Sequence, residues 1–263
     1  MLDRPVRHLC LAALDFETTG LAPNRGDRVV EVAIVRGTMG TTPDEWATLV
    51  HPQRPVAATF VHGITDEMLA GKPRFAAVLP DILRQLEGAV LVAHNAPFDL
   101  GFLEMECERA KVAMPEAPVV DTLGLARRVL AWGNHSLSFL VERLGLPRDQ
   151  AHRALGDARA TWHLASLLLH NIGAADGVVL RDVLRLCERR SPRELDAVFA
   201  ALTLAKVGGA HLLVDYVSPD HPDAATRRAI TVLKVTRRQV DAYCHLRQAE
   251  RTFRLDRLRI VPT

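Results

Sequence analysis

The chain has 263 residues, 48% hydrophobic and 24% charged, a composition typical of a soluble globular protein with one domain or one domain plus a small second. A net charge of +2 is too small to indicate a nucleic-acid partner by itself. No apolar run approaches the ~18 residues of a membrane span, and the four cysteines are scattered without a CxxC pair, which argues against a zinc ribbon or disulfide framework and favours the reduced cytoplasm.

The first predicted strand leads directly to a pair of acids. A mostly apolar run from Leu9 reaches Asp15 and Glu17 and stops at Thr18-Thr19-Gly20. Because side chains alternate along a strand, both carboxylates point to the same side and repel each other unless a cation lies between them. Hard cations such as Mg²⁺ or Mn²⁺ prefer such oxygen ligands. Acidic turn residues at a strand end are the alternative, so a metal site requires more carboxylates later in the chain.

The elements that follow predict a mixed sheet covered by helices. Two alternating strands over 29–36 and 45–51, joined by a turn with Gly and Pro, predict an antiparallel start. Hydrophobic spacing then predicts short strands at 89–93 and 119–120 and helices over 75–86, 97–110, 123–130, 137–144 and 154–170. Strands that alternate with helices are typical of an α/β fold.

Two later segments supply the further groups that a metal site requires. Pro97 favours a helix start that places Asp99 in its first turn. His152 precedes Asp157 by five positions, which places the imidazole in the loop entering the last helix and the carboxylate on its first turn. Strand ends and helix starts are where an α/β sheet presents ligands, and an imidazole can accept a proton from water near neutral pH.

The segments DFETTG, HNAPFD and HRALGDA resemble, in this order, the three motifs of the DEDDh exonucleases, the family of the proofreading subunit of bacterial replicative DNA polymerase. The loop FVHGIT is similar to the His-Gly-Ile loop of the proofreading-type members. This resemblance covers about residues 8–172. It implies an RNase H-like fold and 3′→5′ release of nucleoside 5′-monophosphates with two Mg²⁺ or Mn²⁺ ions per site.

The resemblance also implies roles for single residues. The metal ligands would be the four motif acids, Asp15, Glu17, Asp99 and Asp157, with Asp15 bridging both ions. His152 would be the general base, and His62 would pack against the terminal base, although a surface-loop histidine is the alternative. Thr18, Asn95 and Phe98 are further candidates for substrate contacts. A turn-forming role for Thr18 and Asn95, or a core position for Phe98, would explain these residues equally well.

The segment after the nuclease motifs has a different character. A glycine-containing stretch at 173–177 precedes two helices over 178–190 and 193–205, and then strand-like segments at 212–217, 229–235, 240–246 and 252–261. We therefore predict an RNase H-like exonuclease domain at 1–173, a helical linker at 174–207 and a small SH3/Sm-like β module at 208–263.

The β module resembles the end of WYL domains, which are small β-barrels attached to many bacterial regulators. The matching residues are Tyr243, Arg247, Arg251, Phe253, Arg254, Asp256 and Arg257. Arg238-Gln239-Val240 stand where the signature Trp-Tyr-Leu would be, which argues against the ligand pocket usual in that family. Arginines interleaved with Tyr and Phe suit single-stranded nucleic acid; a solvated strand face is the alternative.

These patterns predict a metal-dependent 3′→5′ exonuclease acting on DNA, with single-stranded 3′ ends as the expected substrate. RNA is the alternative substrate, because a metal site that binds phosphate does not distinguish the sugar. A non-catalytic nucleic-acid-binding regulator is the alternative class, and the complete set of acids with His152 argues against it. No membrane partner is expected. A polymerase partner is less favoured, because a folded module stands where a partner-binding tail would lie.

Overall fold

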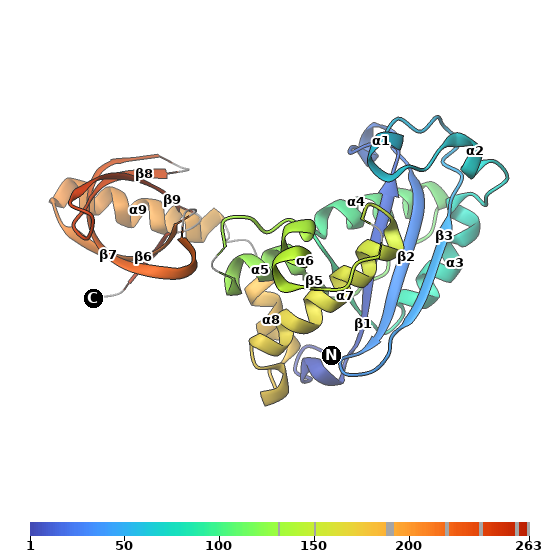
Figure 1. The fold of residues 1–263 in the computed structure, drawn as a ribbon, viewed down its shortest axis with the longest axis horizontal. Helices are drawn as coiled ribbons and strands as arrows, with labels where there is room; N and C mark the ends of the chain where they lie inside the picture. Colours follow the sequence, from blue (N-terminus) through green and yellow to red (C-terminus); the bar gives the residue numbers. More distant parts are fainter. Residues whose placement is uncertain are drawn as a thin grey trace. The chain divides into compact units, whose positions relative to one another are not determined.

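The computed structural model describes residues 1–130, 132–149, 151–187, 192–218, 221–236, 239–255 and 258–261 (Figure 1). Contacts divide the chain into two compact units. The first comprises Met1–Val129 and His135–Cys187, and the second comprises Leu130–Asn134 and Glu188–Thr263. The division expected at residues 173 and 207 remains a prediction.

A mixed sheet forms the centre of the first unit (Figure 1). Its strands, all within the described residues, are β1 (Cys10–Thr18), β2 (Val29–Thr38), β3 (Asp44–Leu49), β4 (Val90–Ala93) and β5 (Val119–Asp121). They lie in the order β3-β2-β1-β4-β5, with β2 antiparallel to both β1 and β3, and with β4 parallel to β1 and β5 parallel to β4. The predicted antiparallel start and mixed sheet are therefore confirmed.

Helices connect and cover these strands. The described helices of the first unit are α1 (Thr59–His62), α2 (Asp66–Leu69), α3 (Phe75–Leu86), α4 (Pro97–Ala110), α5 (Thr122–Val129), α6 (Leu137–Leu144), α7 (Ala154–Asn171) and α8 (Leu180–Cys187), with 3₁₀ turns η1 (Val6–His8), η2 (Pro23–Arg25) and η3 (Ala174–Asp176). Helix α8 contacts α5 and β5, so the first helix of the expected linker packs within this unit. None of the described helices has both the length and the hydropathy needed to cross a bilayer.

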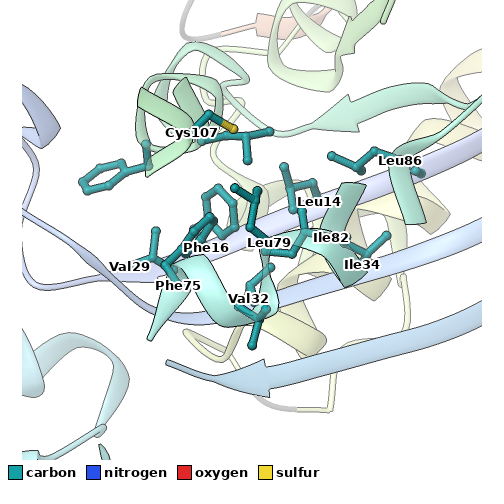
Figure 2. Packing of buried hydrophobic residues seen from close by; sticks show 14 of the residues in the cluster. Leu14, Phe16, Val29, Val32, Ile34, Phe75, Leu79, Ile82, Leu86 and Cys107 are labelled. Carbon is teal, nitrogen blue, oxygen red and sulfur yellow. The ribbon is translucent and has the colours of Figure 1, made fainter. Parts of the chain in front are cut away.

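The two faces of β1 have different roles. Leu14 and Phe16 enter a hydrophobic core made with α3 and α4, where Phe16 meets the ring of Phe75 edge-on at 6.1 Å (Figure 2). Because side chains alternate along a strand, Asp15 and Glu17 face the opposite side, where α7 contacts β1 and β2. The alternation predicted for the acid pair is thus the geometry that the sheet adopts.

The second unit is built from helix α9 (Pro192–Gly208) and an antiparallel sheet. Its described strands are β6 (His211–Ser218), β7 (His221–Val235), β8 (Gln239–Cys244), β9 (Ala249–Arg254) and β10 (Leu258–Ile260), in the order β10-β6-β7-β8-β9. The sheet and α9 share a hydrophobic core.

Two expectations for the β module need correction. The single strand expected over 252–261 is two strands, β9 and β10, at opposite ends of the strand order, because a short helical turn at Leu255 ends β9. Phe253 is 1% exposed and packs against Tyr216 at 4.8 Å, so its ring belongs to the core and cannot stack on a base. Arg238, Asp256 and Arg257 lie outside the described residues.

Candidate active site

Three acidic side chains converge on the α7 face of the first unit. Asp15 and Glu17 leave β1 on the same side, and Asp157 projects from the first turn of α7. Each offers a carboxylate oxygen, and these oxygens lie within 4.8 Å of one another. Residues 142 positions apart therefore meet because α7 packs across the strand that carries the first two acids.

Burial and mutual repulsion make these acids hard to ionise together. Desolvation, followed by the charges of Asp157 and Glu31, raises the pKa of Glu17 to about 8. Desolvation, followed by the charges of Asp99 and Asp157, raises the pKa of Asp15 well above its usual value. A cation between the carboxylates would relieve both effects, and a set of oxygen donors alone fits Mg²⁺ or Mn²⁺.

Asp99 lies beside this group of three. Pro97 begins α4 as predicted, and Asp99 occupies its first turn with 4% of its surface exposed. Its Oδ1 accepts the Phe16 N–H at 3.1 Å. Desolvation raises the pKa of Asp99 to about 7, although the Phe16 N–H lowers it. Asp99 is near enough to raise the pKa of Asp15, and its role as a metal ligand remains a prediction.

His152 stands in the loop that enters α7. Its side chain is exposed, and its φ of 58° is left-handed, a conformation that histidine adopts more readily than most residues. Its backbone N–H bonds to the Asp157 carboxylate, and its side chain is close enough to Asp157 and His62 to influence the pKa of each. His152 therefore lies near Asp157 and His62, and its role as general base remains a prediction.

Three further charged residues line the site and escaped the sequence analysis. Arg153 donates to both oxygens of Glu31, at 3.0 and 2.6 Å. Arg148 donates from Nε to Asp157 Oδ1 at 2.8 Å and forms an ion pair with it, with Nη2 2.6 Å from the same oxygen. Glu31 faces Glu17 across the β1–β2 ladder, so strand pairing could have found it. Arg148 lies outside the three motif segments, and Arg153 lies within HRALGDA at a position to which the resemblance assigns no role.

His62 forms a hydrogen bond with the last residue of β1. It is 6% exposed, so the surface-loop alternative is wrong. Its Nδ1 accepts the Ile64 N–H at 3.0 Å, which leaves the proton on Nε2 to be donated to the Thr18 carbonyl at 3.3 Å. Burial lowers the pKa of His62, which favours this neutral form. Contact with a terminal base remains a prediction.

The other substrate candidates all have local partners. Thr18 donates from its hydroxyl to the Gly20 carbonyl at 2.6 Å. Asn95 has a φ of 70° and donates its N–H to Asp121 Oδ1 at 2.9 Å. Phe98 packs against the core, with its ring 5.0 Å from that of Phe102. These contacts show turn and core roles, while substrate contacts of all three remain predictions.

An RNase H-like sheet with converging carboxylates defines the class of this protein as a nuclease-type phosphodiester hydrolase. The model of the RNase T exonuclease family matches residues 12–165, and the chain belongs to this family. The matched range contains all four motif acids and His152.

The relatives are bacterial replication and exonuclease proteins. The chain is 44% identical over 168 residues to a DNA polymerase III subunit epsilon-like protein of Rhodobacter capsulatus, which covers 61% of this chain and 24% of that protein. It is 40% identical over 161 residues to the PolC-type DNA polymerase III of Thermotoga petrophila, a match that covers 60% of this chain and 12% of that protein. It is 32% identical over 178 residues to the 3′-5′ exonuclease DinG of Bacillus subtilis, a match that covers 66% of this chain and 19% of that protein. The chain thus spans at most about a quarter of the length of these relatives.

Solved structures show the same fold. Exonuclease X in complex with 5′ overhanging duplex DNA is 28% identical, with a TM-score of 0.54 over 68% of this chain and 99% of that chain. The nuclease domain of 3′hExo, a DEDDh family member bound to rAMP, is 19% identical, with a TM-score of 0.52 over 62% and 94%. These likenesses support the RNase H-like assignment of the first unit.

Proposed function

We propose that this protein is a 3′→5′ exonuclease that removes nucleoside 5′-monophosphates from DNA with two divalent cations. The observation that carries the proposal is the convergence of Asp15, Glu17 and Asp157 within 4.8 Å in a chain of the exonuclease family. The relatives named as polymerase III proteins and as a 3′-5′ exonuclease favour DNA and this polarity.

The charges around the site support two cations. Five carboxyl groups gather there, on Asp15, Glu17, Glu31, Asp99 and Asp157. Two guanidinium groups, on Arg148 and Arg153, oppose them among the residues that the structure describes. If all five acids ionise, the surplus is three negative charges, which one divalent cation cannot balance and two can.

Roles for the individual residues follow from their places. Asp15, Glu17 and Asp157 would hold the cations, with Asp99 contributing beside Asp15. Two such cations, when bound, stabilise the attacking and leaving oxygens of an in-line displacement. His152, exposed in the loop before α7, would accept the proton of the attacking water. His62 and Thr18 would shape the place of the terminal nucleotide.

The direct test is a cleavage assay with oligonucleotides labelled at the 5′ end. DNA and RNA strands, single and double, are incubated with the full chain and Mn²⁺ or Mg²⁺, and a parallel reaction contains EDTA. We expect a descending ladder on DNA that requires the metal and releases 5′-monophosphates. Products shortened from the labelled end, cleavage in EDTA, or a ladder on RNA alone would contradict the proposal.

We further propose that the second unit binds the same strand. Its residues 188–263 carry 14 Lys and Arg against 9 Asp and Glu, whereas the first unit carries 19 against 22. On the exposed side of its sheet, His211, Thr231 and Tyr243 are direct cross-strand neighbours. The ring of His245 lies 4.7 Å from that of His211 and 5.2 Å from that of Tyr243. Such a row of exposed rings can stack on bases.

Tyr243→Ala tests this surface in the full chain. We expect the Kd for a fluorescent oligothymidylate to rise about 5- to 150-fold in EDTA, since stacking on one ring contributes about 1–3 kcal/mol per base. Fluorescence anisotropy measures the Kd, and Tyr243→Phe, which keeps the ring, is the matched control. Equal Kd values for the wild type and Tyr243→Ala would mean that this face is only a solvated strand surface.

A further inference from the structure

Arg148 is bound to a carboxylate that the proposed metal site requires. Its Nη2 and Nε lie 2.6 and 2.8 Å from Oδ1 of Asp157, and both side chains are about nine-tenths buried. Nη1 also donates to the Ser138 hydroxyl at 2.8 Å, so α6 helps to hold the guanidinium in place. This is a built contact between partly desolvated charges, unlike a surface ion pair.

A divalent cation and this guanidinium compete for the same carboxylate. A metal ligand oxygen lies about 2.0–2.2 Å from Mg²⁺ or Mn²⁺, and a guanidinium nitrogen 2.6 Å from Oδ1 of the same carboxylate would leave two positive groups close together. Their repulsion is strong where water is largely excluded. Binding of the cation at Asp157 therefore requires that Arg148 withdraw or loosen.

We propose that Arg148 is the internal counter-cation of the metal-free site, which a divalent cation displaces from Asp157 when it binds. Arg148 is then a positioning residue: it keeps Asp157 oriented while no metal is present and sets how tightly metal binds. This inference rests on the proposed metal site, and it adds a residue that none of the exonuclease motifs contains.

Arg153 provides a matched comparison within the same loop. It makes an equally short ion pair, 2.6 Å from Nη2 to Glu31 Oε1, and it also carries charge beside the site. Glu31 is outside the group of three converging carboxylates. Replacing either arginine removes one positive charge from the vicinity, but only Arg148 occupies a carboxylate of that group.

The test is Mn²⁺ binding to the full chain by isothermal titration calorimetry, without nucleic acid. We expect Arg148→Gln to bind Mn²⁺ about tenfold more tightly than the wild type, a ratio within the usual range of competition between linked ligands. Arg148→Lys should lie between them, and Arg153→Gln should change the affinity by less than about threefold. Simple damage to the site would weaken binding, so the sign of the change is diagnostic.

Thermal unfolding provides a second readout. In EDTA, Arg148→Gln should melt below the wild type because Asp157 loses its partner, and saturating Mn²⁺ should remove the difference. Equal or weaker Mn²⁺ binding by Arg148→Gln, or an equal gain in Arg153→Gln, would overturn the proposal. Failure of the wild type itself to bind Mn²⁺ would instead refute the proposed function.

Discussion

Replacing Asp15 with asparagine should abolish metal-dependent cleavage and, at the same time, stabilise the metal-free protein. We expect the rate to fall by about 10³-fold or more, because the central ligand of the proposed site loses its charge. The stabilisation follows because Asp15 is desolvated and repelled by Asp99, Asp157, Glu17 and Glu31. Asparagine has nearly the same shape and carries no charge.

The pH dependence of the melting temperature checks this physical cause. The pKa values of Glu17 and Asp99 are raised to about 8 and about 7, so the folded chain holds protons that the unfolded chain releases near pH 4. In EDTA the wild type should therefore lose stability as the pH rises from 5 to 8. Asp15→Asn should lose less stability than the wild type over the same pH range, because one fewer negative charge remains in the cluster.

Differential scanning calorimetry at pH 5, 6.5 and 8 measures the melting temperatures of both proteins. For a chain of this size, each kcal/mol of unfolding free energy shifts the melting temperature by about 2–4 °C. The activity assay with Mn²⁺ accompanies it. Wild-type turnover by Asp15→Asn would refute the metal site. A melting temperature of Asp15→Asn below that of the wild type at every pH would refute the proposed repulsion between Asp15 and the neighbouring carboxylates, whatever the activity of the variant.

Replacing His152 with asparagine should lower kcat and leave substrate and metal binding unchanged. A positioned general base contributes about 10²- to 10⁴-fold, so we expect a decrease of this size. Asparagine is chosen because it tolerates the left-handed φ of 58° and should keep the backbone N–H on Asp157.

Steady-state kinetics and Mn²⁺ calorimetry separate the two roles that His152 could have. An unchanged KM and an unchanged Mn²⁺ affinity, together with the lower kcat, are the expected pattern. Loss of Mn²⁺ affinity would show that the loop merely orients Asp157. A kcat above about one third of the wild-type value would exclude His152 as the base.

Much of this site can be predicted from the chain alone, because its main features depend on local geometry. Strand alternation places Asp15 and Glu17 on one side, and the sheet adopts that arrangement. Proline at a helix start places Asp99 in a first turn, and α4 begins at Pro97 as predicted. The order and spacing of the motifs then indicate the exonuclease family, which the match over residues 12–165 confirms.

Other features depend on which distant segments pack together. Phe253 is buried because its strand packs in the core shared with α9, and His62 is buried where it contacts the Thr18 carbonyl at the end of β1. No local pattern in the sequence indicates either burial. Likewise, the turn at Leu255 divides one apparent strand into β9 and β10, because the two halves pair with different partners, β8 and β6.

The ion pairs that balance the charges of the site also depend on the tertiary structure. The sequence determines that five acids exist and where their backbones lie within strands and helices. The tertiary structure decides that Arg148, which donates to Ser138 of α6, meets Asp157 of α7, and that Arg153 meets Glu31 of β2. The physical reason is that strand alternation and helix starts are set by a few neighbouring residues. Each ion pair depends instead on how the fold places the loop before α7 against a helix or a strand, and Arg153 and Glu31 are 122 positions apart.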